Sequence, residues 1–138
     1  MASAGELPGD SLEQVMPLAK TLGIETLVNT PSAVRARLSW AESLCTSGGV
    51  LHGGVIMALA DSTGGVCAFL NLPEGANGTT TIQSTTNFLR AVRGGHIEAE
   101  SHPLHAGRTV IVIETDVTDA EDRRVARVTQ SQAVLRPA

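Results

Sequence analysis

One long apolar segment dominates the hydrophobic pattern of this chain. Residues 53–70 carry a single charged side chain, Asp61, and read at helical pitch they predict a helix about 27 Å long. Apolar side chains occupy most of its circumference, so we expect a sheet to bury this helix on nearly all sides. Gly64 and Gly65 interrupt it at a cost of about 1 kcal/mol each relative to alanine, which indicates close packing at that point.

The same segment is just long enough to cross a membrane. Asp61 near its middle would cost about 2.5–3.5 kcal/mol on insertion scales, and neither flank carries Lys or Arg. We therefore interpret the segment as the core helix of a globular protein and predict no membrane partner.

The chain after this helix follows a strand pattern. Short turn signals separate four segments rich in alternating or β-branched residues, which predicts an antiparallel meander. In the first segment, strict alternation places Thr81 and Ile82 on opposite faces, with Ser84 and Phe88 on the same face as Ile82. The four segments are residues 79–89, 95–101, 109–118 and 125–135.

The amino-terminal residues predict a short helix after a loose tail. The tail comprises residues 1–10. Ser11 and Gln14 form a capping box that opens a helix running to about Thr21, and Gly23 supplies its stop.

Between this helix and the long one, residues 24–40 alternate weakly and predict one or two strands divided at Pro31. We therefore divide the chain into residues 1–22, a tail with a short helix, and residues 23–138, one α+β domain. In that domain a curved antiparallel sheet of about five or six strands wraps around the long helix.

Composition and charge narrow the partners and the compartment. The net charge of −4 and only three aromatic residues argue against nucleic-acid binding. Cys45 and Cys67 are too few for a disulfide framework and show no metal-ligand spacing, so we predict no metal. The acidic amino terminus lacks an apolar signal region, which makes the cytoplasm the expected compartment.

The start and middle of the long helix resemble a known family. The pattern Gly-x-x-His-Gly-Gly followed by Ala-Leu-Ala-Asp resembles the hotdog-fold acyl-CoA thioesterases of the PaaI-like family. Residues 81–91 resemble the strand that follows this helix, and residues 107–109 resemble part of the last hairpin. The resemblance implies a hotdog fold, acyl-CoA hydrolysis without metal or prosthetic group, and a homodimer, often a dimer of dimers. The motif residues are Gly49, His52, Gly53, Gly54 and 58–61.

Thioester hydrolysis needs donors for an oxyanion and a base or nucleophile. A helix amino terminus offers unpaired N–H groups, and Gly53 and Gly54 lack the Cβ atoms that would keep a carbonyl away. Asp61 is the only carboxylate in the apolar helix, so we predict that it activates a water or attacks the thioester carbon directly. Both routes remain open at this point.

Helix geometry predicts that two subunits share the site. His52 and Asp61 are nine residues apart, so they lie about 900° apart in rotation and about 13.5 Å apart along the axis. One helix cannot aim Gly53 and Asp61 at the same carbonyl. A two-fold dimer would supply the glycine end from one subunit and the acid from the other.

Three further polar residues belong to the predicted site. His52 either contacts the thioester or simply caps the helix. Thr81, by resemblance, helps to hold the attacking water. Thr46 stands where family members commonly have Asn; its hydroxyl can still hold a water, but with a shorter reach than an amide.

Three arginines lie at predicted strand ends and turns, where they could meet the phosphates of CoA or form a solvated rim: Arg90, Arg93 and Arg108. Two other functions remain open. A hotdog hydratase or dehydratase would remove enoyl absorbance instead of releasing thiol, and an acyl-CoA sensor domain would bind its ligand without turnover.

Overall fold

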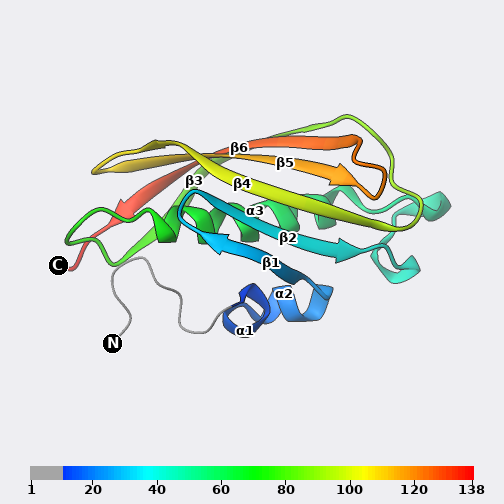
Figure 1. The fold of residues 1–138 in the computed structure, drawn as a ribbon, viewed down its shortest axis with the longest axis horizontal. Coiled ribbons are helices and arrows are strands. Elements are labelled where there is room, and N and C mark those ends of the chain that lie inside the picture. The colour runs from blue at the N-terminus through cyan, green and yellow to red at the C-terminus, as the bar shows by residue number, and fades with distance from the viewer. Residues whose placement is uncertain (1–10) are drawn as a thin grey trace.

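The computed structural model describes residues 11–138, and the apolar segment forms its central helix, α3 (Gly53–Leu70), as predicted. Figure 1 shows α3 running along a curved sheet of six strands, all paired antiparallel, which confirms the predicted α+β fold. The strands are β1 (Glu25–Thr30), β2 (Ala33–Ser39), β3 (Gly78–Phe88), β4 (His96–Ala106), β5 (Val110–Asp119) and β6 (Arg124–Leu135).

The order of the strands differs from a simple meander. The sheet runs β1-β2-β4-β5-β6-β3, so the strand directly after the helix pairs with the last strand of the chain and forms an edge of the sheet. Turn signals predict neighbours in sequence, but residues 89–95 are a long crossover that carries the chain from one edge of the sheet to its middle. The predicted meander is therefore correct for β4, β5 and β6 and wrong for β3.

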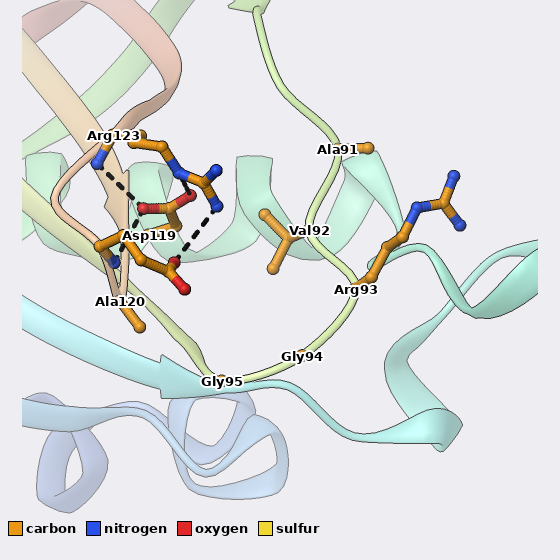
Figure 2. A pocket seen from close by; sticks show the side chains of 9 residues that line it. Ala91, Val92, Arg93, Gly94, Gly95, Asp119, Ala120 and Arg123 are labelled. Carbon is orange, nitrogen blue, oxygen red and sulfur yellow. Dashed lines mark hydrogen bonds and ion pairs between the residues drawn. The ribbon is translucent and has the colours of Figure 1, made fainter.

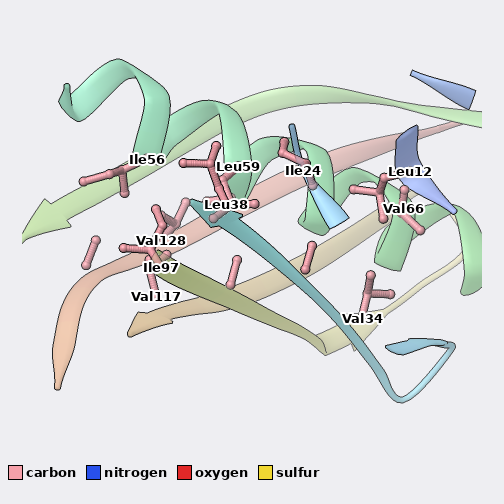
Figure 3. Packing of buried hydrophobic residues seen from close by; sticks show 14 of the residues in the cluster. Leu12, Ile24, Val34, Leu38, Ile56, Leu59, Val66, Ile97, Val117 and Val128 are labelled. Carbon is pink, nitrogen blue, oxygen red and sulfur yellow. The ribbon is translucent and has the colours of Figure 1, made fainter. Parts of the chain in front are cut away.

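One side of α3 fills the concave face of the sheet. Ile56, Leu59 and Val66 on the helix pack against Leu38, Ile97, Val117 and other strand residues that point inward (Figure 3). These are fully apolar contacts of close-packed side chains, and they account for the strongest part of the sequence pattern.

The opposite side of α3 is open, which corrects the prediction of burial on nearly all sides. Gly54, Met57 and Asp61 are exposed along one stripe, and the Met57 side chain is 44% exposed. The helix has the length and composition of a membrane span, yet half of it is buried in the sheet. A single sheet covers only one side of a helix, so the apolar circumference leaves a surface for something else to cover.

The two mid-helix glycines differ in their surroundings. A Cβ at Gly64 would overlap the carboxamide of Gln130, whereas a Cβ at Gly65 would meet nothing within 4 Å. Close packing is therefore confirmed at Gly64, and Gly65 faces an open space.

The amino-terminal helix is two helices, α1 (Leu12–Val15) and α2 (Pro17–Leu22), because Met16 is extended ahead of Pro17. Ser11 is the N-cap of α1, as predicted, but its side chain makes no capping hydrogen bond, so the Ser11 half of the predicted capping box is absent. Gly23 ends α2 in the left-handed region with φ of 75°, as predicted. The predicted tail of residues 1–10 lies outside the described residues.

Candidate active site

The start of α3 leaves one backbone amide free. His52 caps the helix, and its Nδ1 accepts a hydrogen bond of 2.8 Å from the N–H of Gly54. The His52 carbonyl accepts from Val55 at 3.0 Å and from Ile56 at 3.3 Å. Among residues 11–138 the N–H of Gly53 has no partner. Of the two predicted glycine donors, only Gly53 therefore has an amide available to a ligand.

A cavity of about 440 Å³ opens beside this amide. The ring of Phe88 forms one wall, because its nearest atoms lie 3.2 and 3.3 Å from the point that a Cβ of Gly53 would occupy. Thr46 and Arg90 also line the cavity, together with apolar side chains such as Ile56. We call this space the amide cavity.

Asp61 lies on the open stripe of the helix and lines a second cavity of about 490 Å³. Its neighbours there include Ser62, Phe69, Thr81 and Gln132. The carboxylate is exposed in the single chain, which corrects the prediction of a buried acid. We call this space the acid cavity.

A β-bulge brings Thr81 to the acid cavity. Thr81 pairs with Gln132 on β6, and the register then shifts by one residue at Ile82. Thr81 thus faces the helix side together with Gln132, whose Nε2 donates to its Oγ1 at 2.7 Å. The strict alternation predicted along this strand is wrong, because the extra residue also turns Phe88 toward the same face.

Sequence reasoning missed Gln132. It is 2% exposed and lies on the core-facing side of β6, between apolar positions such as Val128 and Val134. A polar residue at a position expected to be apolar was the available signal, and Gln130 gives the same signal two residues earlier.

The two cavities have no lining residue in common. Within the described part of one chain, the Gly53 amide and the Asp61 carboxylate therefore face separate spaces. This is the separation along and around the helix that the spacing of the motif predicts.

The three arginines also divide between two regions. Arg90 lines the amide cavity, and Arg93 donates from Nη1 to the carbonyl of Gly48 at 3.2 Å, in the loop that leads into α3. Arg108 lies on the β4–β5 hairpin, where its carbonyl accepts from Arg136, at the other end of the helix. One chain does not bring all three together.

A third cavity, of about 400 Å³, lies between residues 91–95 and the β5–β6 turn (Figure 2). Burial alone would raise the pKa of Asp119, but backbone N–H groups of Arg123 and Glu121 and the Arg123 guanidinium donate to its carboxylate and hold that pKa below its usual range. The Arg93 side chain points away from the Asp119–Arg123 ion pair (Figure 2). The Asp119 carboxylate therefore stabilises the β5–β6 turn through these hydrogen bonds.

Among residues 11–138, no three His, Cys, Asp or Glu side chains gather closely enough to hold a metal ion.

Comparison with known proteins gives consistent matches. The thioesterase superfamily matches residues 48–126. The protein Rv1847 of Mycobacterium tuberculosis is 31% identical over 118 residues, 84% of each chain. Its solved structure has a TM-score of 0.85 at 29% identity and covers 89% of this chain and 99% of that one.

Two further matches have named activities. The structure of the thioesterase HI1161 from Haemophilus influenzae has a TM-score of 0.82 at 28% identity, covering 93% of this chain and 92% of that one. The 1,4-dihydroxy-2-naphthoyl-CoA hydrolase of Escherichia coli is 30% identical over 87 residues, 63% of each chain.

Proposed function

Because this chain belongs to the thioesterase superfamily and is a thioester hydrolase of the hotdog fold, we propose that it hydrolyses acyl-CoA in the cytoplasm at sites shared between two copies of the chain. The Escherichia coli relative is named for a CoA thioester, which supports CoA as the thiol released here. The observation that carries the proposal is the position of the Gly53 amide and the Asp61 carboxylate, which lie on one helix but in separate cavities.

The amide cavity would bind the thioester carbonyl. The free N–H of Gly53, at the positive end of the α3 dipole, would donate to the carbonyl oxygen as negative charge develops there. Since Nδ1 of His52 accepts a hydrogen bond, the proton of its neutral ring is on Nε2, which can donate toward the thioester. Thr46 would help to hold the substrate or a water, and Arg90 would meet the CoA phosphates from the cavity wall. Arg93, which lies beside the loop that leads into α3, would meet the same phosphates.

The acid cavity of the second copy would supply the attacking group. In one route Asp61 takes a proton from water while the water oxygen bonds to the thioester carbon, and the tetrahedral intermediate then expels CoA thiolate, which is protonated. In the other route the Asp61 carboxylate attacks the thioester carbon, CoA thiolate leaves and is protonated, and water then hydrolyses the mixed anhydride to the acid and free Asp61. A single turnover in ¹⁸O-labelled water detects the anhydride route when water attacks the Asp61 carbonyl of the anhydride, because an Asp61 oxygen then leaves in an unlabelled acid product and the label enters Asp61. Attack on the acyl carbonyl would label the acid product just as the general-base route does.

The exposed edge of the sheet supports the two-fold assembly. β3 is an edge strand with side chains exposed on both faces, and Ile82 is 63% and Phe88 51% exposed. Long exposed edges invite pairing with another strand, and the open stripe of α3 with Met57 lies on the same side of the fold as the acid cavity. Pairing two copies along β3 would cover both surfaces.

Subunit mixing tests the shared site. Asp61→Asn removes the acid, and Gly53→Val places side-chain atoms against Phe88 where the carbonyl must approach. Each variant alone should release little thiol. After random exchange of the two variants, half of the dimers are mixed and each has one intact site, so about a quarter of wild-type activity should return. Mixed dimers that form without regaining activity would refute the sharing of sites.

A further inference from the structure

We propose that Gln132 is a positioning residue that fixes the direction of the Thr81 hydroxyl in the acid cavity. The inference rests on the proposed function, in the route where Asp61 activates a water, and it takes from the family resemblance the role of Thr81 in holding that water beside Asp61. The carboxamide of Gln132 would act only through Thr81 and would not itself touch the reacting atoms.

The position of Gln132 suits this role. Its side chain is 2% exposed, and it lines the acid cavity together with Asp61 and Thr81. Thr81 lies directly opposite Gln132 in the β3–β6 register, and the Nε2–Oγ1 distance is 2.7 Å. The carboxamide therefore reaches Thr81 from the core, on the side away from solvent.

The bulge at Ile82 explains why the pair can exist. Thr81 and Phe88 are seven residues apart, so a regular strand would put them on opposite faces. The extra residue places both on the face toward α3, Phe88 against Gly53 and Thr81 against Gln132. One strand thus contributes to both cavities, and the bulge sets the direction of the Thr81 side chain.

The hydrogen bond determines which partner Thr81 can serve. A hydroxyl has one proton to donate and two lone pairs that accept. The Nε2–H of Gln132 occupies one lone pair, so the Thr81 proton is directed to a different acceptor. In the acid cavity that proton would be donated to a lone pair of the water, while a proton of the same water is donated to Asp61. The water is then held with its second lone pair free for attack.

Gln130 provides a matched control on the same strand. It is 1% exposed and also faces the helix, but it lines neither cavity, and its two polar side-chain atoms have no hydrogen-bond partner among residues 11–138. Replacing Gln130 by leucine therefore removes a buried amide of the same size without touching Thr81.

The experiment compares thiol release by Gln132→Leu and Gln130→Leu at saturating acyl-CoA. We expect Gln132→Leu to lower kcat about tenfold with KM within about twofold, as for the loss of one oriented hydrogen bond, and Gln130→Leu to keep the wild-type kcat. Thr81→Val should lower kcat similarly, and the double variant with Gln132→Leu should lose no more. A purely structural role would instead lower the unfolding temperature and leave kcat of the folded enzyme unchanged.

Other outcomes are equally decisive. Gln132→Glu keeps the side-chain shape, but its ionised form can only accept, so it should draw the Thr81 proton away from the cavity and lower kcat even if Gln132→Leu fails to fold. Wild-type kcat in a folded Gln132 variant would overturn this inference alone. A wild-type enzyme that releases no thiol from acetyl-, hexanoyl-, palmitoyl- or benzoyl-CoA would overturn the proposed function and this inference with it.

Discussion

His52 caps α3, and a substitution can separate this observed task from the one that the proposed function adds. Its Nδ1 caps α3 by accepting from Gly54, and in the proposed function its Nε2 would donate toward the thioester. Asparagine is an equally good capping residue but lacks the second donor in that position. We expect His52→Asn to unfold in urea like the wild type while kcat/KM falls about tenfold or more.

The matched variant is His52→Ala, which loses both tasks. It should lower the free energy of unfolding by about 1 kcal/mol and lower kcat/KM to the same extent as His52→Asn. If His52→Asn kept full activity, His52 would be a helix cap and nothing more.

The two cysteines should differ sharply in reactivity. Burial raises the pKa of the Cys67 thiol to about 11, and its Sγ lies 3.7 Å from the Ser101 carbonyl in the core. Cys45 is only partly buried. Since the thiolate is the reactive form, Ellman's reagent at pH 8 should label one thiol per native chain and two after denaturation. Two rapidly labelled thiols in the native protein would contradict the buried position of Cys67.

At the scale of the element, Gly64 is where α3 meets the sheet most closely. Alanine is the better helix former by about 1 kcal/mol, but its Cβ would overlap the buried carboxamide of Gln130. We expect Gly64→Ala to lower the free energy of unfolding by about 1–3 kcal/mol in urea titrations. Adding Gln130→Ala removes the obstructing group, so the double variant should be more stable than Gly64→Ala alone. A double variant that is less stable would show that the two residues do not compete for space.

The elements that the sequence predicts well are those whose signal is local. The apolar run from Gly53, the stop at Gly23 and the division of the first strands at Pro31 all appear in the structure. The predictions are wrong where a single residue changes the backbone against the surrounding hydrophobic pattern. Pro17 breaks the predicted helix, and the extra residue Ile82 reverses the face of half a strand.

In the candidate site too, the residues in a local motif are predicted from the sequence, and those that depend on distant pairing are not. His52, Gly53 and Asp61 stand in a short motif, so their identity and their separation on the helix follow from the sequence. Gln132 depends on the pairing of β3 with β6, which are about fifty residues apart and not adjacent in chain order. No local pattern specifies that register. The sequence also fails to predict the open stripe of α3. The apolar pattern of a helix is the same whether its own sheet or another chain buries it.

At the scale of the whole molecule, the apolar surface that one chain leaves exposed indicates where a second copy could bind. The sheet has two edge strands, β1 and β3, and each contains a bulge with an exposed apolar residue. Leu27 on β1 is 39% exposed and Ile82 on β3 is 63% exposed. Only β3 adjoins both the acid cavity and the amide cavity, through Thr81 and Phe88. If dimers form through β3, the two bulges should respond differently to the same substitution.

We therefore expect Ile82→Lys to yield single chains in sedimentation and to lose most thiol release, because charge on an edge strand opposes pairing and each site would lack its second half. Leu27→Lys places the same charge in the equivalent bulge of the other edge strand and should keep both the dimer and the activity. Circular dichroism would verify that both variants fold. An Ile82→Lys protein that stays dimeric and active would exclude β3 as the interface, and an active single chain would show that one copy alone holds a complete site.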